Sequence, residues 1–599
     1  MRPAVRQRRP DHGISESMIE SDWQERGSSK IRLVVVWVAT IAGVVILAGR
    51  LFYWQVLRHD DLQSIGQRWQ LVDIPIPALR GAILDRHGFA LALDEYEFEI
   101  YATPRDIGDP EGLAVDLAAV LDMDPDTLAA MLSRKDQPSV SLAWDAPLAT
   151  AREVEKIKDE WNTGALGISA ARKRVYPEKD LACHLLGFVT YDHEIDYDAF
   201  YGVEESFNSE LRGQAGSWGG SAETVDLRIS IGSSSVVLPR DGQDVILTID
   251  RTIQQLVEDE LKNTIEEWAA ERGTIIVMDP RSGAILAMAS YPGYDPNPDL
   301  DLPISEDQFF NPAVSEAYEP GSVFKVVTMA AALDAGVVGR YTTYYDQGQI
   351  FVGGHLIYNW DRKSYGTTSM TDLLKYSLNV GAATLSTNLG PERFYDYVNR
   401  FGFGQPTGID LPYESKGLMR VPGDGNWREG DLGTNAFGQG IAVTPIQMIT
   451  AVAAVANDGV LPRPYVVQRI EEDGQVIEEF HPQSGQQVIS PWVAEELTEM
   501  LVEVMAGKEN LELPGYAIAG KTGTAQIPVT GGYHPSDTIA TFVGYAPARD
   551  PKFVVLIKID KPTKSPWGTV VAVPAFERIA ERLFLYLGIP PDEFGITRT

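Results

Sequence analysis

The sequence predicts an α+β fold: an antiparallel sheet with helices on both faces, preceded by a mixed α/β domain and one transmembrane helix. After residue 244, a helix and two strand-like runs precede a helix-rich insert, and three strand-like runs and a closing helix follow it. Such an order joins neighbouring strands by short turns and places helices against the sheet. Residues 60–240 instead show short mixed elements with many turns, and one long apolar run lies near the N-terminus.

The apolar run from Leu33 to Gly49 carries no charge and is about as long as a bilayer-spanning helix. A cleaved signal peptide is the competing interpretation, but the long hydrophilic leader and the lack of a small-x-small site before Arg50 favour an uncleaved anchor. Because basic residues precede the run, we expect a cytoplasmic tail (1–32), a transmembrane anchor (33–57) and an extracytoplasmic remainder.

The composition excludes several classes of function. A net charge of −33 in 599 residues argues against nucleic acid as a partner, because phosphate binding needs clustered Lys and Arg. Cys183 is the lone cysteine, and the eight histidines show no metal-ligand spacing, so we expect neither a disulfide nor a metal centre.

The segment 58–240 is expected to form a pedestal domain, and 241–599 the catalytic domain. The Gly- and Ser-rich stretch 216–244 is interpreted as the connection between them. The basic run "ARKRVYP", from Ala171 to Pro177, is interpreted as a solvated charge cluster.

Within the catalytic domain the pattern predicts each element in order. An amphipathic helix contains Ile253, Leu261 and Trp268, and the two apolar runs around "PRSG" predict a β-hairpin. The remaining elements are a helix-rich stretch over 305–510, strands at 516–527, 538–546 and 552–560, and a closing helix over 573–588.

Lys325 stands in the apolar run "EPGSVFKVVTMAAALDAG", where an ammonium is costly unless it is paired or neutral. Ser322 precedes it by three residues near the expected start of a helix, and residues three apart share a helix face. Burial lowers the pKa of a lysine, and a neutral lysine can take the proton of a serine. By itself S-x-x-K is short and common, and an N-cap serine beside a snorkelling lysine fits it equally well.

Two further motifs follow in order. "YSLNVG" supplies Ser377 and Asn379, and because residues two apart do not share a helix face, we expect a loop there. "GKTGTAQ" supplies Lys521 and the residues after it on a predicted strand. The set S-x-x-K, S-D-N and K-T-G in this order is typical of penicillin-binding proteins and class A β-lactamases, and here the middle motif is Ser-Leu-Asn.

The third motif also matches a phosphate-binding loop, because "GYAIAGKT" fits G-x-x-x-x-G-K-[ST]. That loop must open a helix, but "GTAQIPVTGGYHP" follows, in which Gly and Pro oppose a helix. The sequence therefore favours a strand over a nucleotide site.

With these motifs the chain resembles the class B, monofunctional penicillin-binding proteins. "RGAILDRHGFALA", "RVYPEKDLACHLLGFV" and "GVEESFNSELRGQAG" resemble segments of that family's pedestal, and "FGQGIAVTPIQM" and "TFVGYAPARDPKFVVLIKID" resemble its catalytic domain. The resemblance implies the penicillin-binding transpeptidase fold and a peptidoglycan D,D-transpeptidase, a serine acyltransferase with a carboxypeptidase side activity, that needs no cofactor.

The resemblance also implies roles. Ser322 is expected to be the acylated nucleophile, Lys325 its base, and Ser377 the hydroxyl that relays a proton to the departing D-Ala. Asn379 is expected to hold the substrate amide, and the K-T-G strand to bind the terminal carboxylate and supply part of the oxyanion hole. The residues of that strand are Lys521, Thr522, Gly523 and Thr524.

The implied partners are stem peptides ending in D-Ala-D-Ala, β-lactams, the cytoplasmic membrane and a membrane glycosyltransferase. Two alternatives stay open: a penicillin-binding scaffold that mainly activates that glycosyltransferase, and a β-lactam-hydrolysing or sensing relative. Hydrolysis would need a carboxylate to activate water. Glu429 in "REGDLG" is the candidate, and we interpret it as a solvated loop residue because Gly follows Leu432 where β-lactamases have Asn.

Overall fold

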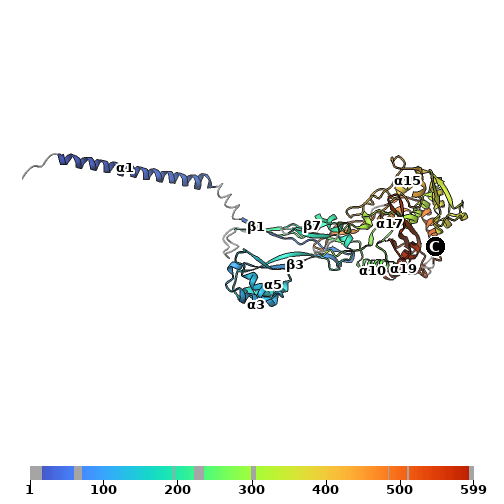
Figure 1. Cartoon of the computed structure of the whole chain (residues 1–599), viewed down its shortest axis with the longest axis horizontal. Coiled ribbons are helices and arrows are strands. Elements are labelled where there is room, and N and C mark those ends of the chain that lie inside the picture. Colours follow the sequence, from blue (N-terminus) through green and yellow to red (C-terminus); the bar gives the residue numbers. More distant parts are fainter. Residues whose placement is uncertain are drawn as a thin grey trace, which may run out of the picture. The chain divides into compact units, whose positions relative to one another are not determined.

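The computed structural model describes residues 17–59, 71–192, 196–221, 235–297, 305–482, 485–508 and 511–592. By the density of contacts the chain divides into two units. One comprises residues 1–76 and 216–238, and the other comprises 77–215 and 239–599 (Figure 1).

The first unit contains the apolar helix. Helix α1 (Ser17–Phe52) continues into a short π-helical turn, Tyr53–Leu57. Within it, Ile31–Leu57 is long and apolar enough to cross a membrane, with a mean hydropathy of 2.5. The same unit holds an antiparallel sheet of β1 (Leu71–Ile76), β8 (Gly216–Ser221) and β9 (Ser235–Val237).

The stretch interpreted as a connection between domains therefore contains two strands, β8 and β9, which pair with each other. Residues 222–234 of that stretch lie outside the described residues.

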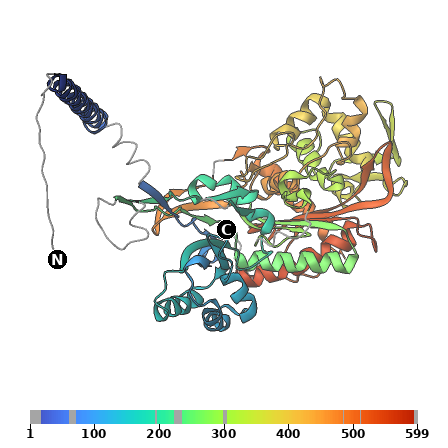
Figure 2. The ribbon, with the colours of Figure 1, turned by 60° about the vertical axis from the view of Figure 1, so that its left-hand side comes forward.

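A five-stranded antiparallel sheet organises the second unit, in the order β12-β11-β23-β22-β21. Helices α10 and α19 pack on one face and α17 on the other, so the sheet is covered on both sides (Figure 2). This confirms the predicted hairpin and the three late strands. The bounds are α10 Arg251–Trp268, β11 Arg272–Met278, β12 Ile285–Tyr291, α17 Pro445–Ala456, β21 Ala519–Val529, β22 Gly532–Ala546, β23 Phe553–Asp560 and α19 Gly568–Tyr586.

The starts of the two helices on the first face differ in how well the sequence marks them. Asp250 caps α10 by accepting from the backbone N–H groups of Thr252 and Ile253, which the first turn of a helix leaves without partners. Helix α19 begins at Gly568, five residues before the predicted start, and Pro574 lies inside it. The sequence prediction placed Pro574 in the first turn, where proline is favoured, and so missed the turn before it.

Between β12 and β21 lies the expected helix-rich insert, which carries several two-stranded ribbons as well as β18 and β19. Its helices are η3 Glu306–Gln308, α11 Pro312–Ser315, η4 Gly321–Phe324, α12 Lys325–Asp334, α13 Met370–Lys375, α14 Asn379–Leu389, α15 Pro391–Arg400, α16 Glu429–Asn435 and α18 Pro491–Met505. Its strands are β13 Thr343–Asp346, β14 Gln349–Val352, β15 His355–Tyr358, β16 Gly366–Ser369, β17 Val460–Leu461, β18 Val467–Glu472, β19 Gln475–Glu479 and β20 Gln486–Gln487.

The segment 77–215 and the catalytic segment share a sheet. Strand β10 (Asp244–Leu247) pairs in parallel with β2 and antiparallel with β18, so one mixed sheet runs β19-β18-β10-β2-β3-β4, with β5 also on β3. The other elements are β2 Ile83–Leu84, β3 Ala90–Ala102, η2 Pro104–Asp106, α3 Pro110–Leu121, α4 Pro125–Leu132, β4 Val140–Ala146, α5 Leu148–Glu160, β5 Leu166–Val175, α6 Cys183–Leu186, β6 Phe188–Asp192, β7 Asp196–Phe200, α7 Gly202–Ser206 and α8 Asn208–Leu211.

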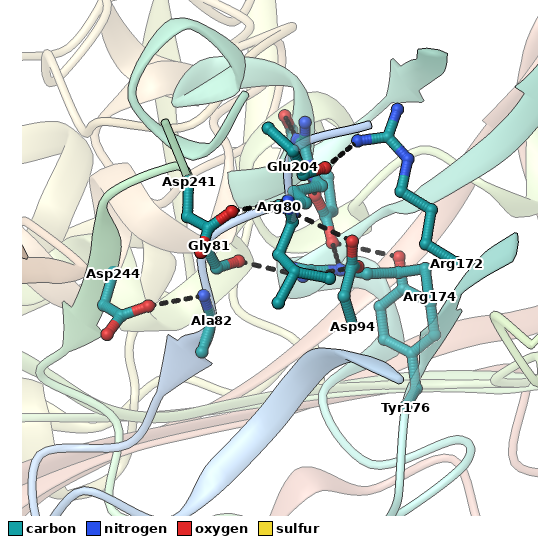
Figure 3. Close-up of polar contacts among 12 residues, drawn as sticks. Arg80, Gly81, Ala82, Asp94, Arg172, Arg174, Tyr176, Glu204, Asp241 and Asp244 are labelled. Atoms are coloured by element: carbon teal, nitrogen blue, oxygen red, sulfur yellow. Dashed lines mark hydrogen bonds and ion pairs between the residues drawn. The ribbon is translucent and has the colours of Figure 1, made fainter. Parts of the chain in front are cut away.

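A buried ion network lies where these strands meet, and it corrects one sequence interpretation (Figure 3). Arg172 and Arg174 are 9% and 2% exposed, so "ARKRVYP" is not a solvated cluster. The Arg174 guanidinium donates to Glu204 at 2.8 Å, and Arg80 donates to the other oxygen of Glu204 at 2.7 Å. A carboxylate shared by two guanidiniums compensates their burial, which is why such charges can leave water.

Candidate active site

The Ser322 hydroxyl is carried by a tight turn rather than by a regular helix. Residues Gly321–Phe324 form a 3₁₀ turn, and the α-helix begins only at Lys325. Gly321 has φ +58°, and its N–H donates to Gly438 O at 3.0 Å. Gly438 also has a positive φ, and a Cβ there would lie 2.2 Å from Gly321 O, so this close approach requires a glycine at position 438.

Lys325 Nζ lies 3.0 Å from Ser322 Oγ. It also lies 2.6 Å from Ser377 O and 2.8 Å from Asn379 Oδ1, and its residue is 1% exposed. Among the described residues no carboxylate forms an ion pair with it. Burial and, secondarily, the nearby Lys521 amine hold the pKa of Lys325 well below its usual range, which favours the neutral amine.

The S-x-N segment forms the expected loop between α13 and α14. Ser377 has φ +57°, an uncommon conformation for a non-glycine residue. Its carbonyl and hydroxyl oxygens both face Lys325, the hydroxyl at 3.2 Å. Asn379 is the first residue of α14, and its amide donates to Tyr358 O at 3.2 Å, so its oxygen is turned toward Lys325.

The K-T-G segment lies on β21, the last strand of the five-stranded sheet. Lys521 Nζ donates to Ser377 Oγ at 3.1 Å and to Thr522 O at 2.9 Å. Burial, with a contribution from Lys508, lowers the pKa of Lys521 to about 7. A Cβ at Gly523 would lie 2.3 Å from Thr541 Oγ1, which explains the glycine.

A cleft of about 740 Å³ opens beside these groups. Ser322, Asn379 and Thr524 line it, and the Thr524 hydroxyl accepts from Gly568 N–H at 3.1 Å. An edge strand offers unpaired backbone groups on its outer side, so an extended peptide can lie along β21 and reach Ser322. Six of the eight predicted site residues either line the cleft or have side chains that contact the Lys325 or Lys521 amine. The two exceptions are Thr522 and Gly523.

Aromatic residues at the cleft were missed by the sequence analysis. Trp360 and Trp567 both line it, and their rings meet edge to face at 5.6 Å. Phe437 lines it as well, with its ring 6.0 Å from Lys325 Nζ. These residues carry no motif, and a single aromatic residue in a loop looks the same in a sequence whether it covers a site or not.

The two competing interpretations of single motifs do not fit this geometry. Glu429 is exposed at the start of α16 and does not line the cleft. It was expected in a loop, and it is solvated as expected. Lys521 and Thr522 continue a strand instead of opening a helix, as a phosphate-binding loop would require.

Comparison with known proteins shows which families the chain resembles. Residues 273–581 match the family described as "Penicillin binding protein transpeptidase domain", and residues 75–247 match "Penicillin-binding Protein dimerisation domain". Stage V sporulation protein D of Bacillus subtilis is 31% identical over 95% of this chain and 87% of its own length. Penicillin-binding protein PbpB of Mycolicibacterium smegmatis is 32% identical over 92% and 90%.

Solved structures agree. Penicillin binding protein 3 of Mycobacterium tuberculosis, complexed with aztreonam, is similar with a TM-score of 0.65 and 28% identity over 86% of this chain and 98% of that one. A peptidoglycan synthetase from Bifidobacterium adolescentis gives a TM-score of 0.70 with 26% identity over 88% and 98%. The serine-lysine cluster, the strand beside it and these relatives together show that the chain belongs to the class B penicillin-binding proteins, the monofunctional transpeptidases.

Proposed function

We propose that the protein is a peptidoglycan D,D-transpeptidase that cross-links stem peptides through an acyl-Ser322 intermediate and is inhibited covalently by β-lactams. The observation that carries the proposal is the contact between Ser322 Oγ and the buried Lys325 amine at 3.0 Å. A base whose pKa is lowered by burial can be neutral at working pH and still accept a proton.

In the acylation step, Ser322 Oγ attacks the carbonyl carbon of the penultimate D-Ala, and its proton passes to Lys325 Nζ. The C–N bond to the terminal D-Ala then breaks, and Ser377 Oγ delivers a proton to the departing amine. Ser377 suits this relay because its hydroxyl lies within 3.2 Å of both lysine amines.

The K-T-G strand and Asn379 position the donor peptide. A protonated Lys521 and the hydroxyl of Thr524, which lines the cleft, bind the terminal carboxylate, while Asn379 holds the substrate amide. The backbone N–H groups of Ser322 and Thr524 form the oxyanion hole, an effect worth about 3–4 kcal/mol per donor in a serine protease. No metal enters these steps, because the chain's own groups supply base, acid and oxyanion donors.

Deacylation decides the product. An amine of a neighbouring stem that attacks the acyl carbon gives a cross-link, and water gives a carboxypeptidase product. A β-lactam acylates Ser322 in the same way, but its leaving nitrogen stays tethered to the acyl group. The exposed position of Glu429, away from the cleft, supports transfer rather than rapid hydrolysis.

Residues 1–32 are proposed to be a cytoplasmic tail and 33–57 an anchor that holds the catalytic domain outside the cytoplasmic membrane. The apolar helix Ile31–Leu57 supports the anchor, and the basic residues before it support the orientation. Protease added to the outer face should digest a C-terminal tag and spare an N-terminal one, and digestion of the N-terminal tag would refute the orientation.

We also propose 58–240 as a pedestal, 241–599 as the transpeptidase domain, and a membrane glycosyltransferase as a partner of the pedestal. The family matches at 75–247 and 273–581 support this division. A Ser322→Ala chain that still stimulates glycan polymerisation would establish the scaffold role separately from catalysis.

Intact-mass analysis with benzylpenicillin, followed by mapping of the adduct, tests the central proposal. The expected adduct lies on the peptide containing Ser322, and Ser322→Ala should abolish it without lowering the melting temperature. An adduct that persists in the variant would show that the nucleophile is elsewhere.

A further inference from the structure

A second cavity, of about 500 Å³, is lined in part by Tyr318 and Glu319, just before the segment that carries the nucleophile, and Lys561 lines both this cavity and the cleft. Three extended segments line it, with Tyr318 bridged to Val443 and Leu418 bridged to Ala442, together with residues of strands β11, β21, β22 and β23. Glu319, three residues before Ser322, lines this cavity and not the cleft. The cavity is therefore distinct from the cleft but shares its walls.

Most charged side chains that line this cavity form ion pairs with each other, but one acidic and one basic residue do not. Three acid–base pairs are satisfied within the lining: Arg272 with Glu316, Lys561 with Glu271, and Lys558 with Asp560. Glu319 and Arg420 are the remaining charged residues of the lining. Among the residues that the structure describes, neither forms an ion pair, and Arg420 is exposed.

Glu319 is buried, at 8% exposed, yet only one of its oxygens is satisfied. Its Oε1 accepts from Gly440 N–H at 2.9 Å and from Tyr533 OH at 3.3 Å. Its Oε2 has no hydrogen-bond partner within the described part of the chain. A buried carboxylate oxygen without a donor is costly, so a donor from outside the protein would be bound there.

Two further buried atoms in the same lining lack partners. Asp560 directs Oδ2 to Lys558 at 2.6 Å and leaves Oδ1 unpaired among the described groups, and the Tyr318 hydroxyl is likewise unpaired. The cavity thus combines several open acceptors on its buried side with an unmatched guanidinium. Its apolar walls come from Ile441, Ile527 and Ile539.

We propose that this cavity binds a zwitterionic amino-acid group, with its ammonium donating to Glu319 and Asp560 and its carboxylate held by Arg420. An ammonium supplies three donors for the open acceptors, and a guanidinium is well suited to a carboxylate. Resting on the proposed function, two sources of this chemistry are at hand: the D-alanine released by acylation, and the amino-acid end of a peptide stem.

The test uses the full chain in detergent micelles with Ser322 first acylated by benzylpenicillin, so that the cleft is blocked. Saturation-transfer NMR then follows titrations of D-alanine and of meso-2,6-diaminopimelate, which stands for a stem's amino-acid end. Saturable binding is expected, whereas propionate lacks the ammonium and alaninamide lacks the carboxylate, and both should bind at least roughly tenfold more weakly. The tighter of the two zwitterions identifies the source.

Two variants locate the site. Glu319→Gln keeps an oxygen for Gly440 and Tyr533 but replaces the open acceptor with a donor, and Arg420→Met removes the exposed guanidinium without touching the core. Each should weaken binding roughly tenfold or more, the loss typical of one charged hydrogen bond. Arg549→Met, on an exposed arginine outside both cavities, is the matched control and should change nothing.

Several results would overturn the proposal: no saturable binding of either zwitterion, binding of propionate or alaninamide as tight as that of the zwitterions, or unchanged affinity in both variants. The first would mean that ordered water fills the cavity, and the other two that the amino acid binds elsewhere or without using both charges. Failure of the proposed function is seen separately, as absence of the penicillin adduct, and in that case the titrations are made on the unmodified chain.

Discussion

Lys325 and Lys521 donate to the same hydroxyl, Ser377 Oγ, at 3.2 and 3.1 Å. Two ammonium groups in such proximity oppose each other, and both residues are 1% exposed. Their proposed tasks differ, because a base must be neutral and a carboxylate-binding group must be charged. The shared hydroxyl therefore joins two amines that work in opposite protonation states.

The rate of acylation by benzylpenicillin should depend on pH in a bell shape. The rate rises as Lys325 loses its proton, and it falls above about pH 7 as Lys521 loses the charge that binds the carboxylate. In Lys521→Arg the guanidinium stays charged, so the falling limb should disappear. Stopped-flow measurement of the second-order rate constant from pH 5 to 9 checks this, and a flat wild-type profile would contradict it.

Replacement of the base should remove most activity and little stability. Lys325→Met should lower the acylation rate by roughly 10²–10⁴-fold, the usual contribution of a general base, and Lys325→Arg should do the same because arginine keeps its proton. Methionine suits the buried position, but Ser377 O and Asn379 Oδ1 lose their donor, so Lys325→Met should cost about 1–3 kcal/mol and lower the melting temperature only slightly.

The matched control for this series is Lys262→Met, on the exposed side of α10, which should leave the rate unchanged. A large drop in the melting temperature of Lys325→Met, with a proportionate loss of rate, would indicate that Lys325 is structural.

The close approach of two glycines should set the position of the nucleophile. In Gly438→Ala the new methyl would collide with Gly321 O, in addition to the strain of a positive φ, roughly 1–3 kcal/mol. We expect the acylation rate to fall at least tenfold, because a displacement of about 1 Å can cost 10²-fold. Gly423→Ala is the control, with positive φ but open space around it, and should acylate normally.

Loss of the charge at Glu204 should destabilise the chain. Burial acts against the charged form, but the guanidiniums of Arg174 and Arg80 outweigh it and hold the pKa of Glu204 below its usual value. Glu204→Gln leaves Arg80 without its carboxylate and Arg174 with Asp94 alone, at 3.3 Å, so we expect a loss of about 3–5 kcal/mol. Glu153→Gln breaks an exposed pair with Lys156 and should cost about 0.5 kcal/mol or less.

The lowered pKa of Glu204 determines how the stability changes with pH. The stabilisation by Glu204 is present above its unfolded pKa of about 4.5 and is lost as pH falls through the folded value. Urea unfolding monitored between pH 3 and 7 should show the wild type losing its advantage over Glu204→Gln on acidification. An equal difference at all pH values would contradict this account.

Short motifs allowed the side chains that meet in the candidate site to be predicted, because the proposed chemistry demands particular side chains at a fixed spacing. Ser322 and Lys325 lie one turn apart, and the S-x-N loop points both side chains at the lysine, as the spacing indicated. Trp567 could not be found this way. It reaches the cleft from the loop before α19, and that proximity depends on the fold and not on any local pattern.

Periodicity predicted the five-stranded sheet because its strands are long and continuous in apolar character. It failed for Arg172 and Arg174, since nothing local distinguishes a solvated arginine from one that meets a distant glutamate. The pairing of β2 with β10 was missed for a related reason. Those partners lie about 160 residues apart, and β2 is only two residues long.

The 3₁₀ turn at Gly321–Phe324 has a consequence for how this motif tolerates changes of length. With three residues per turn, positions i and i+3 lie directly above one another. Insertion or deletion of a single residue between Ser322 and Lys325 would swing the amine about a third of a revolution away from the alcohol. A change of length in the loops around the turn would leave this contact in place, but the two-residue gap inside it is fixed by geometry.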